Sequence, residues 1–180
     1  MRRLILGISV AALLSACGSS NSASFIQGSE SAAPANPAVT TAPAADVKIG
    51  GAVINGPLGA EPTVEIDTSA GPATDLGIVD IAVGTGTEVT ADSTVTAHYV
   101  GYGAASGQMF DGSWSRGEPA TFPLGNVIVG WQEGLQGMKV GGRRALLIPA
   151  EQAYGDTPPP GSGIAAGETL LFVVDLVDVQ

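Results

Sequence analysis

The pattern change near residue 76 constrains the fold of this chain most strongly. From there, short alternating apolar segments bounded by glycines replace a stretch rich in Ser, Ala and Pro. The alternation predicts strands over residues 76–83, 94–100, 144–148 and 169–179. In the second of these, Val95, Ala97 and Tyr99 share one side, as expected for a strand with one buried face. The pattern therefore predicts a β-rich domain over residues 76–180.

One helical pattern interrupts these strands. Trp131, Leu135 and Met138 stand at i, i+4 and i+7, which places them on one face of a helix that ends near Gly141 and Gly142. A single amphipathic helix packed against an antiparallel sheet is an α+β arrangement, which is the fold class predicted here.

Charge and residue content exclude several functions. The net charge is −10, which argues against a nucleic-acid partner because phosphate binding needs a basic surface. The single Cys and single His leave no cluster of zinc ligands, and no glycine-rich phosphate loop is present. We therefore predict no metal and no cofactor, and we interpret His98 as a structural, hydrogen-bonding histidine.

The N-terminus has the form of an export signal. Arg2 and Arg3 precede an apolar run over residues 4–14, which is shorter than the about 20 residues that span a bilayer. The run ends in Leu-Ser-Ala-Cys17, which resembles the lipobox of bacterial lipoproteins. The resemblance implies a signal peptide over residues 1–16, a lipid on Cys17 and an extracytoplasmic protein anchored to the bacterial cell membrane. An ordinary secretory signal with an incidental cysteine is the alternative.

Two segments separate this signal from the domain. Residues 17–45 are mostly Ser, Ala, Pro, Asn and Thr, a composition that predicts a disordered tether. Residues 46–75 form a lead-in segment in which apolar residues lie among glycines or alternate with polar ones, as Val64 and Ile66 do. One or two short strands are predicted there.

Taken together, the motifs of residues 76–180 resemble the FKBP family of peptidyl-prolyl cis/trans isomerases. The matching segments occur in family order: VTAHYVG (95–101), GQMFDGSWSRGEP (107–119), FPLG (122–125), VIVGWQEG (127–134), GMKVGGR (137–143), IPAEQAYG (148–155) and TLLF (169–172). The resemblance implies an antiparallel five- or six-stranded half-barrel sheet wrapped around one short helix.

The resemblance also implies an apolar pocket for a proline ring and a non-covalent isomerisation. The pocket residues carried over form two groups. The catalytic residues would be Tyr99, Asp111 and Tyr154. The substrate-binding residues would be Phe110, Arg116, Val127, Ile128, Trp131, Ile164 and Phe172. The implied partners are proline-containing unfolded or exported proteins and macrolide inhibitors such as rapamycin and tacrolimus, bound by a monomer.

Three departures from the family pattern concern the pocket. Ala120 stands where many members have a bulky aromatic on the pocket wall. The connection from Gly125 to Val127 is shortened, and Pro158–Pro160 stiffen the loop after Tyr154. These departures leave an alternative function open, in which the FKBP fold binds proline-containing partners with little turnover. The retained pocket residues favour the enzyme.

Overall fold

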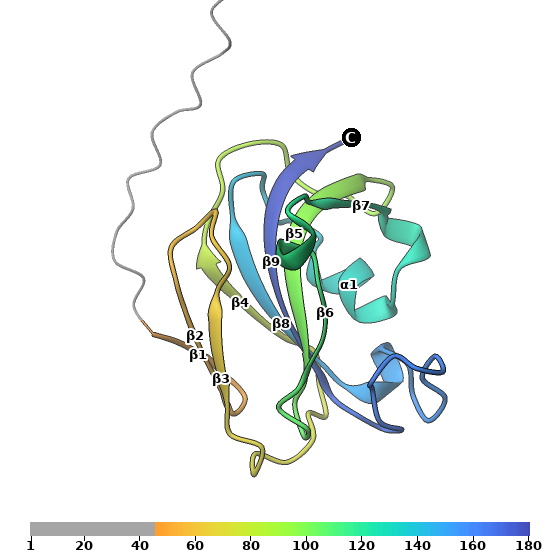
Figure 1. Cartoon of the computed structure of the whole chain (residues 1–180). Helices are drawn as coiled ribbons and strands as arrows, with labels where there is room; N and C mark the ends of the chain where they lie inside the picture. Colours follow the sequence, from red (N-terminus) through yellow and green to blue (C-terminus); the bar gives the residue numbers. More distant parts are fainter. Residues whose placement is uncertain (1–45) are drawn as a thin grey trace, which may run out of the picture. The chain divides into compact units, whose positions relative to one another are not determined.

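The computed structural model describes residues 46–180 (Figure 1). The predicted signal peptide, the tether and the lipid on Cys17 concern residues 1–45 and lie outside the described residues. Within residues 46–180, no helix is long and apolar enough to cross a membrane.

A six-stranded antiparallel sheet forms the centre of the domain. Its strands are β4 (Gly77–Ala82), β5 (Thr94–Gly103), β6 (Met109–Gly112), β7 (Ala120–Pro123), β8 (Arg143–Ile148) and β9 (Leu170–Val179). Their order is β4-β8-β9-β5-β6, with β7 paired to β5. The α-helix α1 (Val129–Gly134) lies against one face of this sheet, on the right in Figure 1. Short 3₁₀ turns are η1 (Trp114–Arg116), η2 (Leu124–Asn126) and η3 (Ala150–Gln152).

The sheet is buried on both faces, and β9 shows this most clearly. Phe172 and Val174 belong to a first core shared with α1, whereas Leu171 and Val173 belong to a second core on the other face. Alternate residues of a strand point to opposite faces, so a continuous apolar run follows when both faces are covered. The alternation predicted for β5 is confirmed, because Val95, Ala97 and Tyr99 are all buried in the first core.

The helix is shorter than predicted. It ends at Gly134, and Gly137 turns the chain with φ of 75°. Met138 is buried in the first core, as its spacing from Trp131 suggested, but it enters from the loop that follows the helix. The prediction of one helix reaching Met138 was therefore wrong, because two glycines interrupt the helical segment before that residue.

The lead-in segment forms a second, three-stranded antiparallel sheet of β1 (Val47–Ile49), β2 (Ala52–Asn55) and β3 (Thr63–Ile66). Ile49, Ala52 and Ile54 are buried against the face of the large sheet that is turned away from α1. They contact the residues of β5, β8 and β9 that form the rest of the second core, namely Val100, Ala145, Leu171 and Val173.

A buried ion pair joins the two sheets. Arg143 and Asp175 face each other in the register of β8 and β9, and the Arg143 side chain is 1% exposed. The guanidinium also donates to the carbonyl of Gly56, at 3.1 Å, and to that of Ala60. Asp175 in turn accepts the N–H of Gly59 at 3.1 Å. The loop between β2 and β3 is thus held against the large sheet by both members of the pair.

Candidate active site

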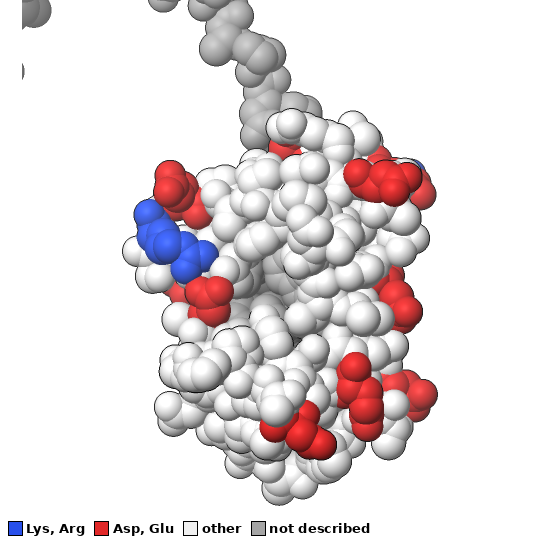
Figure 2. All heavy atoms as spheres, turned by 90° about the vertical axis from the view of Figure 1, so that its right-hand side faces the viewer, with Lys and Arg blue, Asp and Glu red and all other residues white. Residues whose placement is uncertain are grey.

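A cavity of about 310 Å³ opens between α1 and the concave face of the large sheet. Its mouth is the hollow near the centre of the face shown in Figure 2. The residues that line it come from β5, β6, β7, η2, α1 and β9, from the link between η2 and α1, and from the turn after η3. They are Tyr99, Phe110, Asp111, Phe122, Asn126, Val127, Ile128, Trp131, Tyr154 and Phe172.

Aromatic rings set edge to face shape this cavity. The Trp131 indole is 4% exposed, and its ring centroid lies 5.6 Å from Tyr99, 5.5 Å from Phe122 and 5.3 Å from Phe172. Phe110 meets Phe172 at 5.5 Å with an interplanar angle of 86°. Such arrangements are preferred because the positive edge of one ring meets the negative face of the next. The rings therefore form a closely packed apolar box around the buried Trp131 indole.

Gly101 makes room for two of these rings. A Cβ at this position would lie 2.7 Å from Cζ of Phe110 and 2.8 Å from Cε1 of Phe172. Carbon atoms at these distances overlap, since optimal separation is about 3.5–4.0 Å. The absence of a side chain at position 101 is thus a condition for the Phe110–Phe172 contact.

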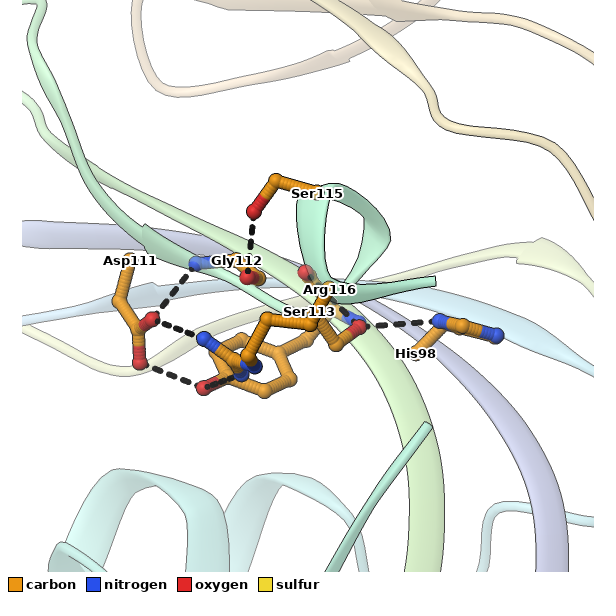
Figure 3. A network of polar contacts seen from close by, with 7 residues as sticks. His98, Asp111, Gly112, Ser113, Ser115 and Arg116 are labelled. Carbon is orange, nitrogen blue, oxygen red and sulfur yellow. Dashed lines mark hydrogen bonds and ion pairs between the residues drawn. The ribbon is translucent and has the colours of Figure 1, made fainter. Parts of the chain in front are cut away.

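One edge of the cavity is polar (Figure 3). The Tyr99 hydroxyl donates to Oδ2 of Asp111 at 2.5 Å, and Arg116 donates to Oδ1 of Asp111 at 2.9 Å and to the Tyr99 oxygen at 3.0 Å. The N–H of Gly112 donates to the same Oδ1 at 2.8 Å. Three donors therefore fix the orientation of the Asp111 carboxylate at the cavity wall.

The network also determines the ionisation states of Asp111 and Tyr99. Burial alone would raise the pKa of Asp111, but the hydrogen bonds from Tyr99, Arg116 and Gly112 outweigh it and lower the pKa below the ordinary 3.8. Burial and the neighbouring carboxylate of Asp111 raise the pKa of Tyr99 above its ordinary 10.0. At neutral pH the site thus holds an ionised carboxylate and a neutral phenol.

His98 supports the network from behind. Its Nδ1 lies 3.0 Å from Oγ of Ser113, and that oxygen accepts the N–H of Tyr99 at 2.9 Å. The His98 ring stacks on Trp114 with centroids 4.0 Å apart. These contacts hold η1, which carries Arg116, against β5, which carries Tyr99.

The structure brings together most of the residues predicted for the site. All of them line the cavity except Arg116, which contacts it through Asp111, and Ile164, which packs partly buried against the first core. Within the described residues, neither the N–H of Ile128 nor the hydroxyl of Tyr154 has a hydrogen-bond partner. Both groups are therefore available to a ligand.

Two lining residues, Phe122 and Asn126, were missed by the sequence analysis. Phe122 lies within a segment that carried the family resemblance, and it pairs with the buried Val95 in the register of β5 and β7. That alternation was a usable signal for an inward-facing ring. Ala120 is partly buried against the first core and does not line the cavity, so Phe122 supplies the aromatic wall on β7.

Comparison with known proteins gives consistent matches for this domain. The sequence profile of FKBP-type peptidyl-prolyl cis-trans isomerases matches residues 85–177. The chain is 54% identical over 118 residues to an FK506-binding protein of Streptomyces anulatus, covering 64% of this chain and 95% of the relative. It is 51% identical over 115 residues to a probable FK506-binding protein of Corynebacterium glutamicum, covering 63% of this chain and 95% of the relative.

Solved structures agree with these sequence matches. The crystal structure of FkpA from Escherichia coli is similar with a TM-score of 0.55 and 38% identity, over 64% of this chain and 51% of that chain. The crystal structure of AtFKBP13 is similar with a TM-score of 0.53 and 36% identity, over 61% of this chain and 96% of that chain.

Proposed function

The chain belongs to the FKBP-type peptidyl-prolyl cis-trans isomerase family, and we propose that it accelerates the folding of exported proteins while a lipid on Cys17 holds it outside the cytoplasm. Its substrates are proline-containing chains. The observation that carries the function is the aromatic cavity, at whose edge the ionised Asp111 carboxylate accepts three hydrogen bonds.

Isomerisation of an X–Pro bond needs no covalent step. The barrier is about 18–20 kcal/mol, because rotation breaks the resonance of the planar amide. The twisted amide is less polar than the planar one, so a dry apolar cavity favours it relative to water. Each tenfold gain in rate requires about 1.4 kcal/mol of additional binding to the twisted form.

The geometry suggests a role for each part of the cavity. The proline ring is held on the Trp131 indole, between Phe110 and Phe172. The free N–H of Ile128 and the free hydroxyl of Tyr154 donate to carbonyls of the substrate. These contacts leave the amide that twists next to Asp111, at the polar edge of the cavity.

Asp111 acts as a fixed charge near the twisting carbonyl. Its lowered pKa means that it carries no proton to give at neutral pH, so a proton-transfer role is not proposed. Tyr99 and Arg116 orient the carboxylate at 2.5 Å and 2.9 Å. Electrostatic stabilisation of this kind depends on charges that are already in place before the reaction.

Exchange NMR of a short X–Pro peptide tests these roles with residues 46–180, at catalytic protein concentrations. We expect faster cis/trans exchange, suppressed by rapamycin or tacrolimus bound in the same cavity. Tyr154→Phe and Asp111→Ala should each slow the exchange. If both variants matched the wild-type rate, the assignment of roles would be wrong.

The alternative function, a binding module for proline-containing partners, rests on Ala120. Ala120 offers less apolar contact on β7 than the bulky aromatic that many family members have there, so the residues around proline would bind more weakly. The same NMR experiment separates the two functions, because a binding module would broaden or shift the peptide signals without accelerating exchange.

The lipid anchor is supported by the basic start, the short apolar run and the Leu-Ser-Ala-Cys17 sequence. Expression of the full chain with radiolabelled palmitate tests it. We expect label and membrane association for the wild type and neither for Cys17→Ser, with Ser20→Ala as the matched control. Equal membrane association of the Cys17→Ser chain would refute the lipid anchor. It would leave the proposed isomerase activity untouched, because that proposal rests on the cavity alone.

A further inference from the structure

Glu168 lies two residues before the start of β9, and only 5% of it is exposed. Its Oε2 accepts the N–H of Ala165 at 2.8 Å, and its Oε1 accepts the N–H of Ser106 at 3.1 Å. Among the ion pairs of residues 46–180, none involves Glu168. A buried carboxylate needs partners, and here the partners are main-chain groups of two segments far apart in the sequence.

These two segments lead to different sides of the pocket. Ala165 ends the rim loop, defined here as residues 156–165, in which Ile164 packs against the first core. Ser106 lies in the turn between β5 and β6, two elements that carry the polar edge and the Phe110 wall. The rim loop also passes close to that wall, since a Cβ on Gly163 would lie 3.9 Å from Cβ of Phe110.

The end of β5 leaves space for this carboxylate. A Cβ on Gly103 would lie 2.2 Å from Oε1 of Glu168 and 2.4 Å from Oγ of Ser106. The Glu168 side chain therefore rests directly on the main chain of β5, at a point where any other residue would displace it. Its position is determined by the glycine as well as by its two hydrogen bonds.

We propose that Glu168 is a positioning residue for substrate binding, which holds the rim loop at a fixed distance from the Phe110 wall. The inference rests on the proposed function, because it concerns the residues on either side of the bound proline. The rim contacts those residues equally in the planar and the twisted states of the amide. Loss of Glu168 should therefore raise KM and leave kcat unchanged.

Four full-length proteins test this role: wild type, Glu168→Ala, Glu168→Gln and Thr169→Val. Thr169 is the matched control, because its hydroxyl accepts the N–H of Ala73 at 3.0 Å at the same junction. Within the described residues, no hydrogen bond joins Thr169 to the rim loop. We expect Glu168→Ala to raise KM for an extended X–Pro peptide about tenfold, which corresponds to about 1.4 kcal/mol of lost binding. Glu168→Gln keeps one acceptor oxygen, so its KM should lie between those of the wild type and Glu168→Ala. The KM of Thr169→Val should match that of the wild type.

Unchanged KM in both Glu168 variants would overturn the inference, and so would an equal rise in Thr169→Val, since that would indicate general loosening of the junction. If Glu168→Ala does not fold, Glu168→Gln alone decides. A wild type without turnover would instead refute the isomerase mechanism. In that case titration of the same peptide against the same proteins would test Glu168 through Kd.

Discussion

Replacing Arg143 with Met should destabilise the whole domain, because it leaves Asp175 buried without its cation. Removing one member of a buried ion pair costs about 3–5 kcal/mol. The carbonyls of Gly56 and Ala60, which accept hydrogen bonds from Arg143, add about 1 kcal/mol each where water does not replace the lost donor. We therefore expect the free energy of unfolding to fall by about 3–7 kcal/mol, a large part of the about 5–15 kcal/mol typical of a domain.

Urea unfolding measures this loss, and two tryptophans report on the two cores. Trp131 lies in the first core, and Trp114 packs against the second. If the lead-in sheet and the isomerase domain form one cooperative unit, single-tryptophan variants at either position should give coincident transitions. Turnover under native conditions should be unchanged, because Arg143 faces the side of the sheet away from the cavity.

The double variant Arg143→Met/Asp175→Leu is the control for the charge. Replacing both members of a buried pair with apolar residues is often neutral, so the double variant should be more stable than Arg143→Met alone. A loss below about 1 kcal/mol in Arg143→Met would refute the reasoning. Separate transitions for the two tryptophans would show that the pair does not couple the sheets.

Three further predictions concern the pocket. Gly101→Ala should lower the free energy of unfolding by about 1–3 kcal/mol through overpacking, and it should slow turnover. Urea unfolding and exchange NMR measure these two effects. An unchanged free energy of unfolding together with an unchanged exchange rate would contradict the close contact with Phe110. For Asp111, whose pKa is depressed in the folded state, the stabilisation is present above pH 3.8 and is lost as pH falls through the lower folded-state pKa. Unfolding midpoints should therefore fall less steeply below pH 3.8 in Asp111→Asn than in the wild type, and equal slopes would refute this. Ala120→Phe should lower KM about three- to tenfold by adding apolar contact at the rim; a raised KM in a stably folded variant would show that Phe122 already fills the wall.

The sequence pattern predicted β4, β5, β8 and β9, most clearly where a strand has a buried face, but it did not predict the short strands β6 and β7. Val95, Ala97 and Tyr99 alternate strictly, and β9 begins with five consecutive apolar residues, Leu170 to Val174. The helix was less predictable, because Met138 satisfies helical spacing while reaching the core from a loop. The spacing of apolar residues indicates which residues are buried. It does not by itself indicate a helix, because a short glycine-rich segment can bury the same residues without helical geometry.

The pocket was predicted from family resemblance, and local pattern alone would not have assembled it. Tyr99 and Asp111 stand on adjacent strands, and Arg116 reaches them from a 3₁₀ turn whose position depends on His98 and Ser113. Such a network depends on tertiary packing. The lead-in sheet was underestimated for the same reason, since strands of three or four residues do not specify the surface on which they dock.

Two adjacent arginines show how β8 ties together all three layers. Arg143 faces the lead-in sheet, whereas Arg144 faces α1 and donates to the carbonyls of Gly134 at 2.8 Å and Gln136 at 3.1 Å. These are carbonyls at and beyond the end of a helix, which lack partners within it. Arg144 is itself held by Asp80 on β4 at 2.6 Å. The same alternation that buries both faces of the sheet therefore directs one cation to each.

This layering bears on how an anchored isomerase can reach its substrates. Asp46, the first described residue, leads into β1, and β1 belongs to the sheet that covers the face away from α1 and the cavity. A lipid anchor attached before residue 46 would thus join the domain on the side opposite the pocket mouth. Because the lead-in sheet is fixed to the domain by the Arg143–Asp175 pair, the point of attachment cannot move round to the cavity without unfolding the second core. The proposed anchor and the open pocket are therefore compatible in one molecule.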